Sequence, residues 1–168
     1  IGRGIYVRPG IPEFMRDQVV PAADVVTPNH FELDFLTGRT TTTLAEVLGA
    51  ARELQQRGPK VVLVTSTVLE GDHPDEINML VVSADGAWQV TTPRLERNFT
   101  GSGDLTAALF LAHLLHSETP GHAVGATADA VYSLLRRTAE LEYAELALVA
   151  AQQELVDPSH HFEVRQLG

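Results

Sequence analysis

The chain contains no cysteine, and this absence removes several kinds of chemistry at once. Without a thiol, a disulfide, a thiolate-bound metal and a cysteine nucleophile are all excluded. A protein that needs no disulfide is compatible with a reducing compartment, so we expect a cytoplasmic location.

Lysine is almost as scarce, because Lys60 is the single lysine among the 12 basic residues. A P-loop and a protein-kinase site each need a lysine within a fixed motif, and Lys60 follows Gly58-Pro59 ahead of an apolar run, which fits neither. The 22 acidic residues leave a formal net charge of −10. We therefore expect no nucleic-acid partner and no anionic membrane partner, since both require clustered Lys and Arg.

Long hydrophobic runs are also missing. No apolar stretch approaches the roughly 20 residues that a membrane-spanning helix needs. The first ten residues lack the basic start and apolar core of a signal peptide. The chain starts with Ile1 rather than methionine, so we expect an N-terminal part of the fold to be absent from this sequence. The 168 residues suit a single domain, 1–168.

Hydrophobic periodicity predicts strands that alternate with helices, followed by a mostly helical half. The predicted strands are Ile5–Val7, Asp24–Thr27, Val61–Val64, Ile77–Val82, Ala87–Thr91 and Phe162–Val164. The predicted helices are Glu13–Val19, Asn29–Thr37, Leu44–Gln56, Asp104–Leu115, Ala123–Arg137 and Glu142–Val156. This order indicates an α/β fold in layers, with a mostly parallel sheet flanked by helices.

The most informative motif is a glycine-rich stretch ahead of a predicted helix. Gly101 and Gly103 flank Ser102, and Asp104 opens the helix. Glycines let backbone N–H groups converge on a ligand, and a helix N-terminus carries partial positive charge, so the stretch suits a transferring phosphoryl group. Asp104 would then take the proton of the attacking hydroxyl. The alternative is a glycine turn followed by an acidic helix cap.

A second motif pairs an amide with a carboxylate. Asn29 and Glu32 are three residues apart and share one face of a predicted helix. Their oxygens are hard ligands of the kind that Mg²⁺ prefers, often through water. The alternative is a capping box, in which Asn at the N-cap and Glu at the third helical position satisfy each other's backbone N–H groups.

The positions of these motifs support a functional interpretation. Thr65 follows the apolar strand Val61–Val64, and Asn29 follows the strand predicted at Asp24–Thr27. In open α/β sheets, ligands bind at the carboxyl ends of the strands. Two polar features therefore fall on the same edge of the sheet, and the glycine-rich helix start can join them there.

Together these residues resemble the ribokinase-like superfamily and, within it, the pyridoxal kinase family. Gly101–Asp104 is similar to the superfamily's GxGD signature, and Asn29–Glu32 is similar to its NxxE motif. Outside the motifs, Ala84–Trp88 and Glu145–Gln152 are similar to bacterial pyridoxal kinases. The resemblance covers nearly the whole chain, but only the second half or so of a family member.

The resemblance implies a role for each matching residue. Asp104 would be the base that activates the 5′-hydroxymethyl group of pyridoxal, and the backbone of Gly101–Gly103 would hold the γ-phosphate. Glu32 and Asn29 would organise Mg²⁺, with ATP as the co-substrate. The residues implied to contact ATP are Thr27, Glu32, Thr65, Thr92, Pro93, Arg94 and Leu95.

The resemblance thus implies an ATP-dependent kinase, a homodimer, that converts pyridoxal and related B6 vitamers into their 5′-phosphates. Two alternatives stay open. One is another ribokinase-like small-molecule kinase, acting on a hydroxymethylpyrimidine or a sugar. The other is a non-catalytic nucleotide-binding fragment, which nucleotide binding without turnover would identify.

Overall fold

The structure is a computed structural model that describes residues 7–117 and 119–168. The strand predicted at Ile5–Val7 lies outside the described residues except for Val7, which forms a bend. Among the described residues, no helix is both long enough and apolar enough to cross a membrane.

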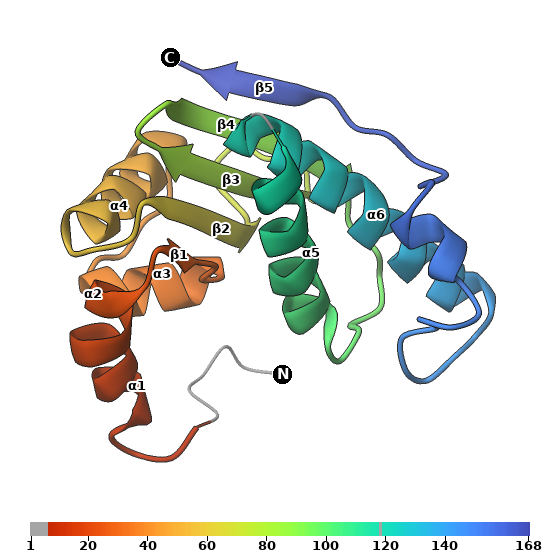
Figure 1. The fold of residues 1–168 in the computed structure, drawn as a ribbon, viewed down its shortest axis with the longest axis horizontal. Helices are drawn as coiled ribbons and strands as arrows, with labels where there is room; N and C mark the ends of the chain where they lie inside the picture. Colours follow the sequence, from red (N-terminus) through yellow and green to blue (C-terminus); the bar gives the residue numbers. More distant parts are fainter. Residues whose placement is uncertain (1–6, 118) are drawn as a thin grey trace.

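A mixed five-stranded sheet has the order β1-β2-β3-β4-β5 (Figure 1). The strands are β1 (Val25–Val26), β2 (Val61–Thr67), β3 (Glu76–Ser83), β4 (Gly86–Pro93) and β5 (Val164–Leu167). β1 and β2 pair in parallel, whereas the other three pairings are antiparallel. The layered α/β class is confirmed, but the prediction of a mostly parallel sheet is wrong for the described strands.

The lengths of the connections explain the antiparallel pairings. Ala84 and Asp85 alone separate β3 from β4, and the loop at 68–75 separates β2 from β3. Neither connection contains a helix, and a parallel pair needs a crossover of about a dozen residues or more. β1 and β2 are joined through two helices, which is long enough for the parallel pairing that they adopt.

Helices cover both faces of the sheet (Figure 1). They are α3 (His30–Thr37) and α4 (Leu44–Gln56) on one face, and α5 (Ser102–His116) and α6 (Pro120–Glu140) on the other. Strand β2 packs against helices on both faces of the sheet. Val62 and Val64 face α4, while Leu63 faces α6. All three side chains are fully buried, as the continuous apolar run predicts.

The helix predicted near Glu13–Val19 is longer than expected and changes its winding along its length. It consists of α1 (Ile11–Phe14), a π-helical turn η1 (Met15–Val19) and α2 (Val20–Ala22). Val20 is the buried residue of these three pieces, and the segment leads directly into β1. Figure 1 shows it standing beside α3 at the β1 side of the sheet.

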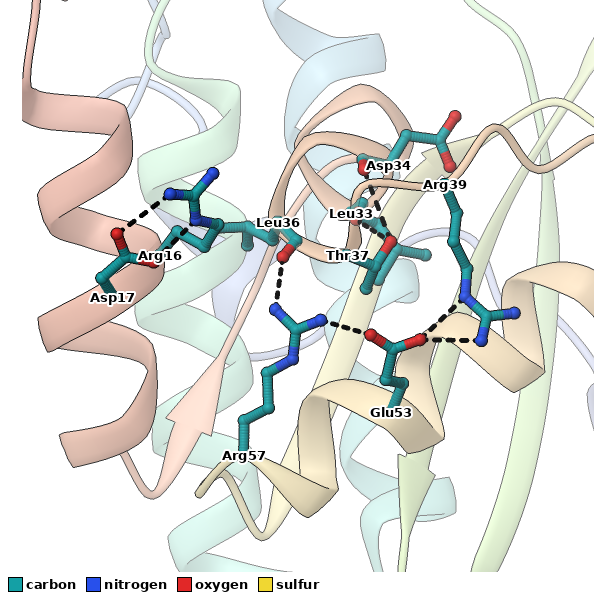
Figure 2. Close-up of polar contacts among 9 residues, drawn as sticks. All are labelled: Arg16, Asp17, Leu33, Asp34, Leu36, Thr37, Arg39, Glu53 and Arg57. Atoms are coloured by element: carbon teal, nitrogen blue, oxygen red, sulfur yellow. Dashed lines mark hydrogen bonds and ion pairs between the residues drawn. The ribbon is translucent and has the colours of Figure 1, made fainter.

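A cluster of charged side chains fixes α3 to α4 (Figure 2). Arg57, which follows α4, donates to the carbonyl oxygen of Leu36 near the end of α3 at 2.6 Å. Glu53 accepts from Arg57 and, at 2.8 Å, from Nε of Arg39. The hydrogen bond from Arg57 is the main reason that the pKa of Glu53 is lowered. The helix that carries Asn29 at its other end is therefore held firmly in place.

The helix predicted over Glu142–Val156 is not formed, and that prediction is wrong. Turns, bends and irregular backbone occupy residues 141–151, followed by a 3-10 turn, η2 (Gln152–Leu155). Glu142 has a φ of 55°, which no right-handed helix accommodates. The backbone N–H of Ala147 donates to Oγ1 of Thr138 in α6 at 3.1 Å instead of to its own helix. Tertiary packing on α6 has overridden the helical periodicity.

The last strand also differs from its prediction, since β5 begins two residues later than Phe162–Val164 predicts. The backbone N–H of Phe162 donates to the Asp129 carboxylate of α6 at 2.9 Å. That hydrogen bond ties Phe162 to α6, and pairing with β4 starts at Val164.

Candidate active site

Three strands bring their carboxyl ends to one edge of the sheet, because β1 and β4 both run parallel to β2. Thr27 follows β1, Thr65 lies in the second half of β2, and Thr92 and Pro93 end β4. Asn29 forms an isolated parallel bridge with Thr65, whose N–H donates to the carbonyl oxygen of Pro28 at 2.9 Å. The edge predicted to bind ligand therefore carries these polar residues together.

Asn29 and Glu32 form the capping box that the spacing allowed. Oδ1 of Asn29 accepts from the Glu32 N–H at 2.9 Å, and Oε2 of Glu32 accepts from the Asn29 N–H at 2.8 Å. The capping interpretation is confirmed. The other oxygen of Glu32 has no hydrogen-bond partner among the described residues, and the side chain is exposed. One carboxylate thus caps the helix and still presents an oxygen to solvent.

The glycine-rich stretch begins α5 in the way that anion binding requires. Gly101 has a φ of 85°, in the left-handed region that favours glycine, and Ser102 starts the helix. Of the three N–H groups predicted to hold the phosphate, that of Ser102 donates to the carbonyl oxygen of Phe99 at 3.2 Å. Within the described part of the chain, the N–H groups of Gly101, Gly103 and Asp104 have no protein acceptor. A Cβ on Gly103 would meet nothing within 4 Å. Three free N–H groups at an accessible helix N-terminus can bind an anion.

A cavity of about 730 Å³ joins the two motifs. Asn29 and Glu32 line it from the start of α3, and Asp104 lines it from the first turn of α5. Thr27 also lines it, directly after β1. Residues that are 75 positions apart in the sequence, Asn29 and Asp104, therefore face one space.

The rest of the cavity wall was not predicted as part of the site. Apolar side chains of the first helical segment contribute much of it, among them Ile11, Met15 and Val19. Their spacing of four residues is the signal that was available, because it places them on one face of a helix. The cavity is consequently polar at the α3 and α5 ends and apolar along the first helical segment.

The predicted nucleotide contacts Thr92–Leu95, at the end of β4 and directly after it, do not line this cavity. Thr92 is buried in β4, Pro93 ends the strand, and the N–H of Arg94 donates to the carbonyl oxygen of Asp75 at 2.6 Å. Leu95 follows. Thr65 is also absent from the cavity wall. These residues share the edge of the sheet with the cavity, and the structure does not bring them to Asp104.

The carboxylates of the site suit a weakly held, hydrated metal ion. In the part of the chain that the structure describes, no group of three or more His, Asp and Glu side chains is arranged to hold a metal. Glu32 and Asn29 offer hard oxygens, as Mg²⁺ prefers, and Mg²⁺ usually keeps several waters and binds substrate phosphates besides one or two carboxylates. The donor set fits such an ion and does not fit a closed metal cage.

Residues 6–148 match the phosphomethylpyrimidine kinase family, and the chain belongs to this family. Among curated proteins, it is 49% identical to the pyridoxal kinase PdxY of Rubrobacter xylanophilus, over 99% of this chain and 58% of that protein. It is 45% identical to the pyridoxal kinase PdxY of Leifsonia xyli, over 98% of this chain and 58% of that protein. The resemblance found in the sequence is confirmed, and the chain spans about 58% of these relatives' length.

Solved structures agree with this relationship. The pyridoxal kinase from Leishmania donovani in complex with ADP superimposes with a TM-score of 0.87 at 27% identity, over 98% of this chain and 59% of that one. The complex of the same enzyme with ADP and pyridoxine gives 0.86 at 27% identity, over 98% and 58%. These likenesses confirm the ribokinase-like fold that the sequence predicts.

Proposed function

We propose that this chain supplies the nucleotide-binding and catalytic-base part, as a single domain over residues 1–168, of an ATP-dependent pyridoxal kinase. The observation that carries the proposal is the cavity shared by Asp104, Asn29 and Glu32. Relatives of 45–49% identity that bear the name pyridoxal kinase support the choice of substrate.

In the proposed reaction, the 5′-hydroxyl of pyridoxal attacks the γ-phosphorus of ATP. The new O–P bond forms as the bond between the γ-phosphorus and the β,γ-bridging oxygen breaks, so that ADP leaves. The hydroxyl proton passes to the carboxylate of Asp104. The free N–H groups of Gly101 and Gly103 hold the γ-phosphoryl oxygens and stabilise the charge that develops on them.

The other residues at this edge are proposed to hold ATP and Mg²⁺. Glu32, through its free oxygen, and Asn29 hold the hydrated ion, which neutralises phosphate charge when bound. Thr27, Thr65 and the segment Thr92–Leu95 contact the nucleotide. The position of these residues at the carboxyl ends of β1, β2 and β4 supports this assignment.

Two further properties are proposed together with the reaction. A cytoplasmic location is supported by the absence of cysteine. A homodimer is supported by the family resemblance.

The matched family is described as phosphomethylpyrimidine kinase, which favours a hydroxymethylpyrimidine as the second candidate substrate. Parallel assays with pyridoxal and with hydroxymethylpyrimidine would separate the two.

Replacing Asp104 tests the proposed base. In the protein that contains this chain, Asp104→Asn keeps the size of the side chain, and no side chain caps α5 at its N-cap, Gly101, so the melting temperature should change little. ATP affinity should persist, because a negative charge near the phosphates is removed. We expect kcat for pyridoxal 5′-phosphate formation to fall by about 10²–10⁴-fold.

Asp85→Asn is the matched control, since Asp85 is an exposed acid in the β3–β4 turn. It should leave kcat unchanged. A loss of less than about tenfold for Asp104→Asn would reject Asp104 as the base. A large loss of melting temperature that accompanies the loss of activity would give Asp104 a structural role in α5 only.

A further inference from the structure

Polar side chains cross the sheet in a continuous chain of hydrogen bonds close to the ligand-binding edge. Arg165 of β5 donates to Oε1 of Gln89 at 2.5 Å, and Nε2 of Gln89 donates to Oδ1 of Asn78 at 2.8 Å. Thr91 donates to the same Asn78 oxygen at 2.6 Å, and Nδ2 of Asn78 donates to Oδ2 of Asp72 at 2.8 Å. We call these five residues the edge network.

The edge network occupies a place where the strand pattern leads one to expect apolar residues. Asn78 lies two residues before Leu80, and Leu80 and Val82 belong to the core under α4. Gln89 pairs directly with Leu80 in the antiparallel ladder. Asn78 and Gln89 are only 2% and 7% exposed. Buried amides destabilise a fold unless every polar group is paired. The loss of any hydrogen bond of the network would therefore destabilise this part of the fold.

The network ends on a loop. Oδ2 of Asp72 also accepts the backbone N–H of Leu69 at 2.7 Å, which ties the two ends of the turn in the loop at 68–75 together. Farther along the same loop, the carbonyl oxygen of Asp75 accepts the N–H of Arg94 at 2.6 Å. The loop therefore connects the edge network on one side with the segment after β4 on the other.

We propose that Asp72 and Asn78 are positioning residues for nucleotide binding. They hold the loop at 68–75, and the loop holds Thr92–Leu95, the segment proposed above to contact ATP. This inference rests on the proposed function. Neither side chain lines the cavity that contains Asp104. Substituting either residue should therefore leave the rate of the chemical step and the binding of the B6 vitamer unchanged.

Substitution of Asp72 separates positioning from charge. Asp72→Ala removes the acceptor of both the Leu69 and the Asn78 hydrogen bonds, and the side chain is only partly buried, so the fold should survive. We expect the KM for ATP and the Kd for ADP to rise about tenfold, with kcat and the KM for pyridoxal within about twofold of wild type. Asp72→Asn keeps one side-chain oxygen that can accept both hydrogen bonds. It should therefore restore the KM for ATP and the Kd for ADP to the wild-type values.

Glu70→Ala is the matched control, because it removes an exposed carboxylate from the same loop and that carboxylate accepts no hydrogen bond among the described residues. It should leave both values unchanged. The proposal is overturned if Asp72→Ala binds ADP as wild type does, if Asp72→Asn fails to restore binding, or if kcat falls together with the melting temperature.

The same measurements distinguish this inference from the proposed reaction. If the wild type binds ADP but phosphorylates no vitamer, the proposed reaction fails, and the ratio of ADP Kd values for Asp72→Ala and wild type still decides the positioning role. If the wild type binds no ADP, both proposals fail.

Discussion

At the scale of single residues, the site uses the same side chains for structure and for proposed chemistry. Glu32 gives one oxygen to the N-terminus of α3 and leaves the other free beside the cavity. The capping interpretation and the metal interpretation of Glu32 are therefore compatible, because each uses a different oxygen of the carboxylate, whereas the single side-chain oxygen of Asn29 already accepts the Glu32 N–H. A substitution that keeps the cap but removes the charge can separate them.

Glu32→Gln is that substitution. The amide oxygen of glutamine can still accept the Asn29 N–H, so the melting temperature should change by only a degree or two, which is about 0.5 kcal/mol or less. If Glu32 holds hydrated Mg²⁺, the Mg²⁺ concentration for half-maximal activity should rise about tenfold or more. Activity titrated with Mg²⁺ at saturating ATP measures this rise. An unchanged Mg²⁺ requirement with a lower melting temperature would leave Glu32 as a helix cap alone.

Local signals indicated the two motifs that meet at the cavity but not the edge network. The capping box and the left-handed Gly101 follow from a few neighbouring residues, and the sequence identified both motifs. The partners of Asn78 come from β4 and from the loop before β3, and Arg165 reaches Gln89 from β5, 76 residues away. Such contacts depend on strand order and register, which no short motif encodes.

At the scale of elements, α6 lies unusually close to the sheet. A Cβ on Gly121 would come within 2.8 Å of Cδ1 and Nε1 of Trp88, and one on Gly125 within 2.6 Å of Val164. Both glycines are buried in α6, where glycine weakens a helix. The close approach of the helix to β4 and β5 explains why glycine stands there.

Gly121→Ala should destabilise the protein by about 1–3 kcal/mol, because the new methyl group overlaps the Trp88 ring, which itself packs in the core under α6. Gly49→Ala in α4 is the matched control. Its Cβ would meet nothing within 4 Å, so the gain in helix propensity should stabilise the protein by about 0.5–1 kcal/mol. Urea unfolding of the two variants measures the difference. Equal midpoints would contradict this account of α6 packing.

Elements with strong local signals were predicted well, and those shaped by tertiary contacts were not. Leu44–Gln56 has both a capping threonine and a continuous apolar stripe, and it forms as predicted. Glu142–Val156 has apolar residues at helical spacing, yet its backbone bonds to Thr138 of α6 and packs against that helix. Periodicity indicates which residues become buried but not against which neighbour they are buried.

At the scale of the whole molecule, the sheet combines two kinds of connection. The part from β1 to β2 crosses over through helices and is parallel, while the part from β2 to β5 is antiparallel. An apolar run such as Val61–Val64 indicates burial on both faces, which helices on either side of a mixed sheet provide equally well. That is why the burial of Val61–Val64 was predicted correctly, although the run itself gave no information on the direction of the neighbouring strands.

The surface around the first helical segment leads to a prediction about the molecule as a whole. Val7, Ile11, Phe14 and Met15 are each between 41% and 57% exposed, and Ile11 and Met15 also line the apolar side of the large cavity. Adjacent exposed apolar side chains of this kind mark a surface that binds an apolar ligand or another protein segment. The curated relatives are longer than this chain, which spans 58% of them.

The 168-residue chain produced by itself should therefore bind a hydrophobic dye in its folded state. Ile11→Gln combined with Met15→Gln should remove most of the dye fluorescence, because both side chains line the cavity in which the dye would sit. Leu115→Gln is the control, since Leu115 is 73% exposed on α5 and lines no part of that cavity. It should leave the fluorescence nearly unchanged. A sharp cooperative melt with no dye signal would contradict this prediction. It would show that the first helical segment exposes too little apolar surface to bind the dye.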